Sequence, residues 1–348
     1  MTAISFAAVI GVSVYAVRSS APHGARLTIP AIAHLLAFLA FAAEVATRSL
    51  KLTWSAKAVG TRLPFMTSLR TSLGGDFAAS ITPARVGAEP ARFLILAQAG
   101  VAASDAMVVL YLERFLEMIS LASVVVLIAV LFDASGRASA AMAGVVGGYA
   151  LFVLGLGVLG VILSRRNVGE EPPSWATLIR LHDKRWAIVQ RWFGRIRTTV
   201  DAFKEMHFGW AALALIASIT HIAVRFTILP ALILSMTQQP VPLSPLIIWP
   251  LGIIYGAGVV PAPGGGGAVE LTFRAALGRV IPPDLFAPAL LWWRFYTFYI
   301  YIALGGLVAG NTALRAVRGV EEAEEELERG YARASSGSSE LTVISDGK

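Results

Sequence analysis

The chain has 348 residues, of which 56% are hydrophobic and only 15% are charged, and its mean hydropathy is +0.68. Because soluble globular chains carry about 25% charged residues, this composition excludes an ordinary soluble domain and predicts a polytopic α-helical membrane protein. The long apolar runs also exclude a transmembrane β-barrel, whose strands alternate in short segments. The chain has no cysteine, so disulfides, thiolate metal sites and cysteine nucleophiles are excluded. No metal or other cofactor is expected.

The net charge of +7 is concentrated in two basic segments. Residues 48–70 carry lysine and arginine without any acid, and residues 164–205 are predominantly basic. The positive-inside rule predicts that both segments are cytoplasmic loops. Their positive charge is expected to set the orientation of the chain in the membrane and to attract lipid headgroups. No nucleic-acid partner is expected.

Apolar runs along the chain predict about six full transmembrane helices. The first run, 3–17, favours a first helix, with a signal peptide as the alternative. Runs close to the roughly 20 residues that cross a bilayer core follow at 28–47, 115–132, 139–163, 210–236 and 286–310.

Residues 71–100 contain apolar stretches that glycines and prolines interrupt. Each half is too short to cross a bilayer. If both basic segments are cytoplasmic, the helices 115–132 and 139–163 form a pair, so 71–100 must enter and leave on the same side. This segment is therefore predicted to be a re-entrant helical hairpin with its break at ITPARVG.

A second pair of short halves, 246–260 and 268–281, flanks the stretch PAPGGGG. It follows an outer turn, so this hairpin is predicted to enter from the opposite side. The predicted fold is one membrane domain over 1–312, with inverted repeats at about 1–135 and 136–312. Such repeats with broken helices are typical of secondary transporters. The composition of residues 313–348 predicts a short charged helix followed by a disordered cytoplasmic tail.

The two predicted breaks share a spacing. Arg114 follows Pro83 by 31 residues, and Arg294 follows Pro263 by the same interval. The glycines 264–267 precede a half-helix, where backbone amides and the helix dipole attract an anion. Tight helix packing is the alternative role for these glycines.

Charged residues inside a membrane are costly and mark functional sites by default. The candidate substrate-binding residues are Arg85, Glu89, Arg92, Glu113, Arg114, Gly264, Gly265, Gly266, Gly267, Glu270 and Arg294. Further intramembrane charges are Asp76, Glu117, Arg225 and Arg274. The alternative is that these charges pair off or that Arg92 and Arg274 snorkel to the interface. The pairs considered are Glu89 with Arg92, Glu270 with Arg274 or Arg294, and Arg114 with Glu113 or Glu117. No catalytic residue or metal ligand is predicted.

The motifs ITPARVGAEPARFLIL, ERFLEMISL and PAPGGGGAVE together resemble the flippase-like membrane domain of lysylphosphatidylglycerol synthases. The resemblance covers roughly residues 1–312, without the synthases' soluble domain. It implies a non-enzymatic protein of the bacterial inner membrane that moves a lipid with an anionic or polar headgroup between leaflets. Ala84 stands where the family commonly has glycine, and Ala88 shifts the first glutamate by one position. A homo-oligomer is compatible with this reading.

Two other functions remain open from the sequence. One is an intramembrane enzyme that acts on lipid phosphates or polyprenyl sugars, with Glu89 or Glu270 as the base. Against it, the sequence shows no nucleophile–base pair, metal cluster or nucleotide-binding motif. The other is a non-transporting assembly factor of a lipid or envelope pathway, which would retain the same hairpins.

Overall fold

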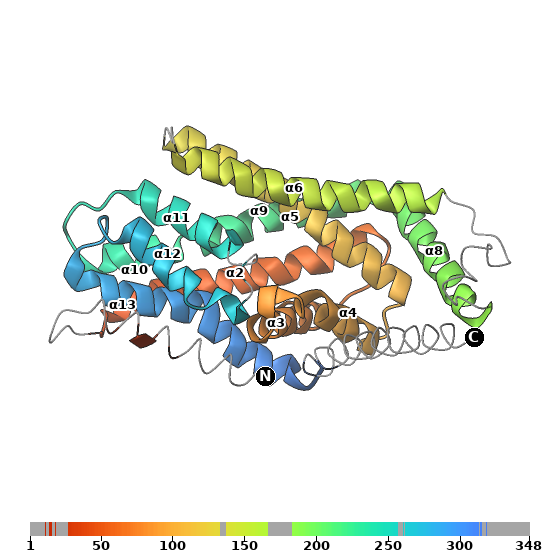
Figure 1. Cartoon of the computed structure of the whole chain (residues 1–348), viewed down its shortest axis with the longest axis horizontal. Coiled ribbons are helices and arrows are strands. Elements are labelled where there is room, and N and C mark those ends of the chain that lie inside the picture. The colour runs from red at the N-terminus through yellow and green to blue at the C-terminus, as the bar shows by residue number, and fades with distance from the viewer. Residues whose placement is uncertain are drawn as a thin grey trace, which may run out of the picture.

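The computed structural model of the chain describes residues 27–132, 137–165, 183–256 and 262–312, with isolated positions outside these ranges. Within these ranges every regular element is a helix (Figure 1). The predicted first helix, 3–17, and the tail, 313–348, lie almost entirely outside the described residues. The predicted all-helical class is confirmed for the part of the chain that the structure describes.

Four described helices are long and apolar enough to cross a membrane. They are Ala31–Ala58, Ala103–Leu131, Val146–Ser164 and Phe208–Met236. The first two are α2 and α5, the third belongs to α6 (Arg137–Ser164), and the fourth joins α9 (Phe208–Arg225) to α10 (Ile228–Met236). The polar helix α8 (Asp183–Lys204) precedes α9 at one end of the bundle (Figure 1).

The predicted span 286–310 is helical over its whole length but is not uniform. It begins as α13 (Pro283–Arg294), passes through the π-helical segment η4 (Phe295–Tyr299) and continues as α-helix through residues 300–312. A π-helical turn inside a longer helix frequently marks a functional position. Here it follows Arg294 directly.

One part of the predicted topology is wrong. Helix α2 does not end near residue 47 but continues to Ala58, through nearly half of the basic segment 48–70. Arg48, Lys51 and Ser55 are therefore buried helical residues rather than residues of a cytoplasmic loop. Their burial is possible because carboxylates from other helices neutralise the two cations, a compensation that local hydropathy does not register.

Two pairs of short helices fold back on themselves. The first pair is α3 (Phe65–Ile81) and α4 (Ala88–Gln98), joined by the 3₁₀ turn η1 (Pro83–Arg85). The second is α11 (Leu243–Gly256) and α12 (Ala268–Leu277), with the turn η3 (Pro263–Gly265) before α12. In each pair the two helices pack together, and η1 packs against η3, so the two breaks meet inside the molecule.

The two breaks have the same backbone geometry. After Pro83, Ala84 and Arg85 have φ values of 48° and 60°, and after Pro263, Gly264 and Gly265 have φ values of 59° and 68°. The following helices begin at Ala88 and Ala268. Left-handed backbone is uncommon for residues other than glycine, so the first break holds two side chains where the second has none.

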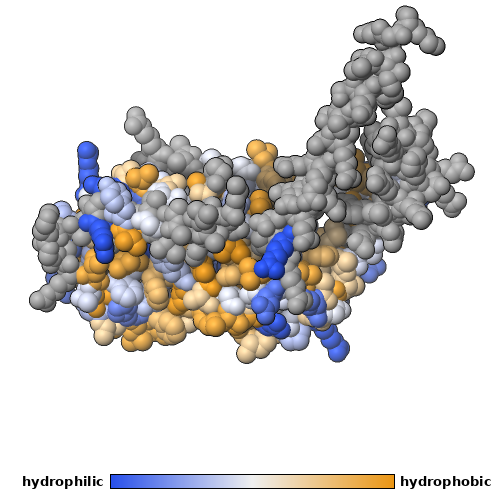
Figure 2. Space-filling model, turned by 60° about the horizontal axis from the view of Figure 1, so that its bottom comes forward, coloured by the Kyte–Doolittle hydropathy of each residue, from blue (hydrophilic) through white to orange (hydrophobic). Residues whose placement is uncertain are grey.

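The hydrophobic core is built mainly from α2, α10, α12 and α13. Phe273 of α12 stacks on Trp293 of α13, with ring centroids 4.9 Å apart. On the outside, apolar side chains of α5 and α6, including Val130 and Leu151, are exposed. Hydrophobic residues cover much of the described surface on the face shown in Figure 2. Apolar side chains thus occur both in the core and on the surface. This distribution fits a lipid environment, since lipid chains solvate an apolar surface.

Candidate functional site

A closed ring of six alternating charges lies between α2, α4 and α5. Lys51 contacts Glu113 and Glu117, with Nζ–Oε distances of 3.0 and 3.5 Å. The other members close the ring through the pairs Glu113–Arg92, Arg92–Glu89, Glu89–Arg114 and Arg114–Glu117. Each cation contacts two carboxylates and each carboxylate contacts two cations. The ring is therefore electrically balanced, with three charges of each sign.

Burial differs around this ring. Lys51 and Glu113 are almost fully buried, whereas the side chain of Glu89 is 45% exposed. The Nη1 atom of Arg92 lies 3.3 Å from Oε1 of Glu89, so the predicted pair within α4 is confirmed. The prediction that Arg92 snorkels is wrong, because its guanidinium donates to the buried Glu113 of α5.

A second group of charges forms an open chain beside the ring. Arg48 Nη2 lies 2.5 Å from Asp76 Oδ2, and Arg48 Nε lies 3.6 Å from Glu44 Oε1. Glu44 also receives a hydrogen bond of 2.6 Å from the hydroxyl of Tyr301. The chain ends at Arg225, 3.7 Å from Glu44, and at Arg85, 3.8 Å from Asp76.

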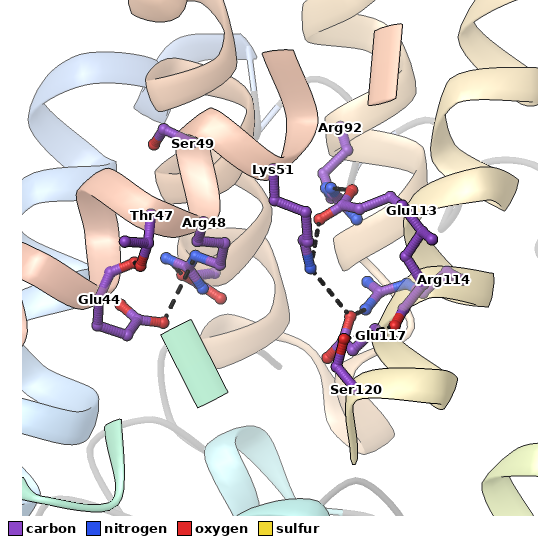
Figure 3. Close-up of polar contacts among 12 residues, drawn as sticks. Glu44, Thr47, Arg48, Ser49, Lys51, Arg92, Glu113, Arg114, Glu117 and Ser120 are labelled. Atoms are coloured by element: carbon purple, nitrogen blue, oxygen red, sulfur yellow. Dashed lines mark hydrogen bonds and ion pairs between the residues drawn. The ribbon is translucent and has the colours of Figure 1, made fainter. Parts of the chain in front are cut away.

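Helix α2 connects the two groups. In Figure 3, Glu44 and Arg48 lie in one group, and Lys51 reaches toward Glu113 and Glu117 in the other. The open chain draws its remaining members from α3, from the break η1, from the end of α9 and from the helix that contains Tyr301. Both halves of the sequence therefore contribute charges to the region beside the breaks.

The second hairpin carries a separate ion pair. Arg294 Nε donates to Glu270 Oε1 over 2.8 Å, and both side chains are buried. The Arg294 guanidinium also lies 4.4 Å from the ring centroid of Phe298, within the range of a cation–π contact. The alternative pairing of Glu270 with Arg274 receives no support, because Arg274 is exposed and the contact is with Arg294.

Glu270 also caps its own helix. Its Oε2 atom accepts a hydrogen bond of 2.8 Å from the backbone N–H of Gly267, and Gly265 N–H donates to Ala262 O. Two of the four amides predicted to attract an anion are thus bonded within the protein. The negative charge at this helix start is the protein's own carboxylate.

The one-residue shift seen in the sequence explains why the two glutamates differ. Glu270 is the third residue of α12, the position from which a glutamate reaches back to the N-cap amide. Glu89 is the second residue of α4, with Pro90 in the third position. It contacts Arg92 and Arg114 instead. A single position therefore decides whether the glutamate caps its own helix or joins the ring.

The structure brings together Glu89, Arg92, Glu113 and Arg114 in the ring, and places Arg85 in the open chain. Glu270 and the glycines 264–267 belong to the second hairpin, and Arg294 of α13 pairs with Glu270. Sequence reasoning missed Glu44, Arg48, Lys51 and Tyr301. The available signal was spacing, because Glu44, Arg48 and Lys51 lie four and three residues apart and share one side of a helix. No group of three or more metal-ligating side chains occurs in the described residues.

The long apolar helices and the buried, paired charges define a multi-pass helical membrane protein with a polar interior. Residues 2–305 match the family model of the lysylphosphatidylglycerol synthase TM region. The chain belongs to this family, which confirms the resemblance found in the sequence and indicates a role in lipid metabolism or transport. A comparison with curated proteins found no match.

Proposed function

We propose that the protein is a lipid translocase that moves a phospholipid or another polar-headed lipid between the leaflets of the bacterial inner membrane. The single observation that carries this proposal is the contact between the two helix breaks beside buried charges. Irregular backbone at membrane depth is tolerated where it is buried in protein or lines a polar cavity. Transporters with inverted repeats bind their substrates at such places.

The arrangement of the helices supports hairpins that enter from opposite sides. The backbone N–H of His207 donates to Ala58 O over 2.8 Å, so the end of α2 lies beside the start of α9. The first hairpin follows α2 at that end. The second follows the segment 237–242, which comes after α9 and α10 have run the length of the bundle (Figure 1).

A labelling experiment tests this topology, because the natural chain lacks cysteine. Arg62→Cys and Thr198→Cys are expected to react with a membrane-impermeant maleimide only from the cytoplasmic side, and Gln239→Cys only from outside. All three side chains are exposed. Labelling of positions 62 and 239 from the same side would exclude inverted hairpins.

A leaflet-resolved assay tests the function itself. The purified full-length protein is reconstituted into liposomes whose fluorescent phosphatidylglycerol is reduced by dithionite only in the outer leaflet. A translocase makes the inner-leaflet fraction reducible without changing the lipid. A chemically altered lipid would indicate an intramembrane enzyme, and an unchanged inner-leaflet fraction would favour an assembly factor.

Substitution of the two equivalent arginines tests their proposed part in translocation. Arg114→Lys and Arg294→Lys are each expected to slow translocation about tenfold or more, equivalent to ~1.4 kcal/mol, because lysine lacks the planar fork of arginine. The exposed Arg274→Lys is the matched control and should translocate at the wild-type rate. If the double variant Arg294→Gln/Glu270→Gln translocates lipid at the wild-type rate, Arg294 serves only as the partner of Glu270.

A further inference from the structure

The two charge groups differ in balance. In the ring, three cations face three carboxylates, and no contact is left open. In the open chain, the order is Arg225–Glu44–Arg48–Asp76–Arg85, so three arginines face two carboxylates. The surplus positive charge of this buried region therefore belongs to the open chain, and its two ends are both cations.

The end arginines are weakly held by the protein. Arg225 and Arg85 lie 3.7 and 3.8 Å from their carboxylates, and no hydrogen bond to either guanidinium is found among the described residues. Nε of Arg225 is buried without a hydrogen-bond partner among the described residues. Arg48 itself is nine-tenths buried. A buried donor without an acceptor is costly, so an oxyanion at the Arg225 end of the chain would gain a hydrogen bond there.

The three arginines lie near one another rather than being scattered. Arg48 and Arg225 both lie near the ring of Tyr301, at 5.3 and 5.6 Å from its centroid. Arg85 is within electrostatic range of both of them. Three guanidinium groups that repel one another favour an anion placed among them. The side chain of Arg85 is 37% exposed, which leaves this end accessible.

The backbone conformation at Arg85 also supports an anion site at this position. Arg85 has a φ of 60°, at the position where the second break has Gly265 with a φ of 68°. A residue with a side chain is strained in this left-handed region. Such outliers cluster at ligand-binding sites. The first break thus carries a charged side chain where glycine would be less strained.

We propose that a singly charged oxyanion binds between Arg85 and Arg225 and converts the open chain into a second, neutral ring. A phosphodiester satisfies this requirement, because it carries one negative charge and offers two oxygens to guanidinium forks. The identification of the anion as a lipid headgroup rests on the proposed function. Free monobasic phosphate has the same chemistry.

Binding of short-chain lipids to the purified full-length protein in a non-ionic detergent tests the site. Dioctanoyl phosphatidylglycerol is expected to bind the wild type saturably in calorimetric titration. Arg225→Gln and Arg85→Gly should each raise the dissociation constant about tenfold or more. Arg274→Gln, an exposed arginine of the other hairpin, should leave it unchanged. Dioctanoylglycerol, which lacks the phosphate, should bind wild type and variants alike.

Thermal unfolding without ligand separates binding from folding. Arg225→Gln should not lower the melting temperature, because Glu44 retains Arg48 and Tyr301, and Arg85→Gly should not lower it because glycine accepts the left-handed backbone. A melting temperature reduced as much as in Arg92→Gln, which opens the balanced ring, would make Arg225 structural and overturn the proposal. Equal lipid affinity in wild type and both variants would also overturn it.

The source of the anion and the translocase activity are separable. Titration with inorganic phosphate at pH 6 that shows the same dependence on Arg85 and Arg225, without lipid binding, would keep the anion site but assign it to free phosphate. Lipid binding at the site without transfer between leaflets would refute the translocase alone. Translocation at the wild-type rate in the Arg85→Gly/Arg225→Gln double variant would refute this site alone.

Discussion

Replacing Glu113 with glutamine is expected to lower the free energy of unfolding by about 3–5 kcal/mol, the cost of removing one partner from a buried ion pair. Glu113 is almost fully buried and contacts both Lys51 and Arg92, so the substitution leaves two buried cations with one carboxylate fewer. Denaturant unfolding of the purified protein in bicelles, compared with the wild type, measures the difference.

The matched control for Glu113 is an exposed pair in the same chain. Lys204 contacts Asp201 on α8 over 2.6 Å, and both side chains are more than half exposed. Asp201→Asn should change stability by no more than about 1 kcal/mol, since water screens such pairs. Similar losses for Glu113→Gln and Asp201→Asn would show that the ring contributes no more than a surface pair.

Gly264→Val is expected to destabilise the second break through two separate effects. A Cβ atom at this position would lie 2.1 Å from the ring of Phe298, and relieving such overpacking commonly costs roughly 1–3 kcal/mol. The φ of 59° adds roughly 1–2 kcal/mol for a residue with a side chain. Because Phe298 stacks on Arg294, translocation should be lost as well.

A rescue variant separates the packing effect from the backbone effect. Phe298→Ala in a Gly264→Ala background should recover the packing part of the lost stability but not the backbone part. Gly252→Ala in α11, where an added Cβ meets no atom within 4 Å, is the control and should not destabilise. Full stability of Gly264→Val would mean that Phe298 moves freely, and close packing at the break would be refuted.

The interruptions of the helices could be predicted from the sequence because proline and glycine act locally. Pro83 and Pro263 lie at the breaks where they were expected, and the helices on either side are as short as the apolar runs indicate. The equal spacing to Arg114 and Arg294 also identified two charged positions that the structure shows in ion pairs. The breaks themselves depend on neighbours within one or two turns, since proline and glycine act on the local backbone.

The charge network could not be predicted in the same way. Lys51 and Glu113 are 62 residues apart, and their contact depends on how α2 packs against α5. The sequence predicts Arg48 and Lys51 in a cytoplasmic loop, because the segment 48–70 carries basic residues without any acid. Only tertiary structure shows that Asp76 and Glu113 neutralise them. The distinction between the ring and the open chain is therefore a property of packing.

The one-residue displacement between Glu89 and Glu270 attaches the two hairpins to their neighbours in different ways. The first is anchored on both sides, since Glu89 and Arg92 engage α5 and Asp76 engages α2. In the second hairpin, Glu270 accepts a hydrogen bond from the start of its own helix and pairs with Arg294 of α13. Rocking the first hairpin would require several buried charges to exchange partners together. The break of the second hairpin also packs against the first break, so a movement of one hairpin would be felt by the other.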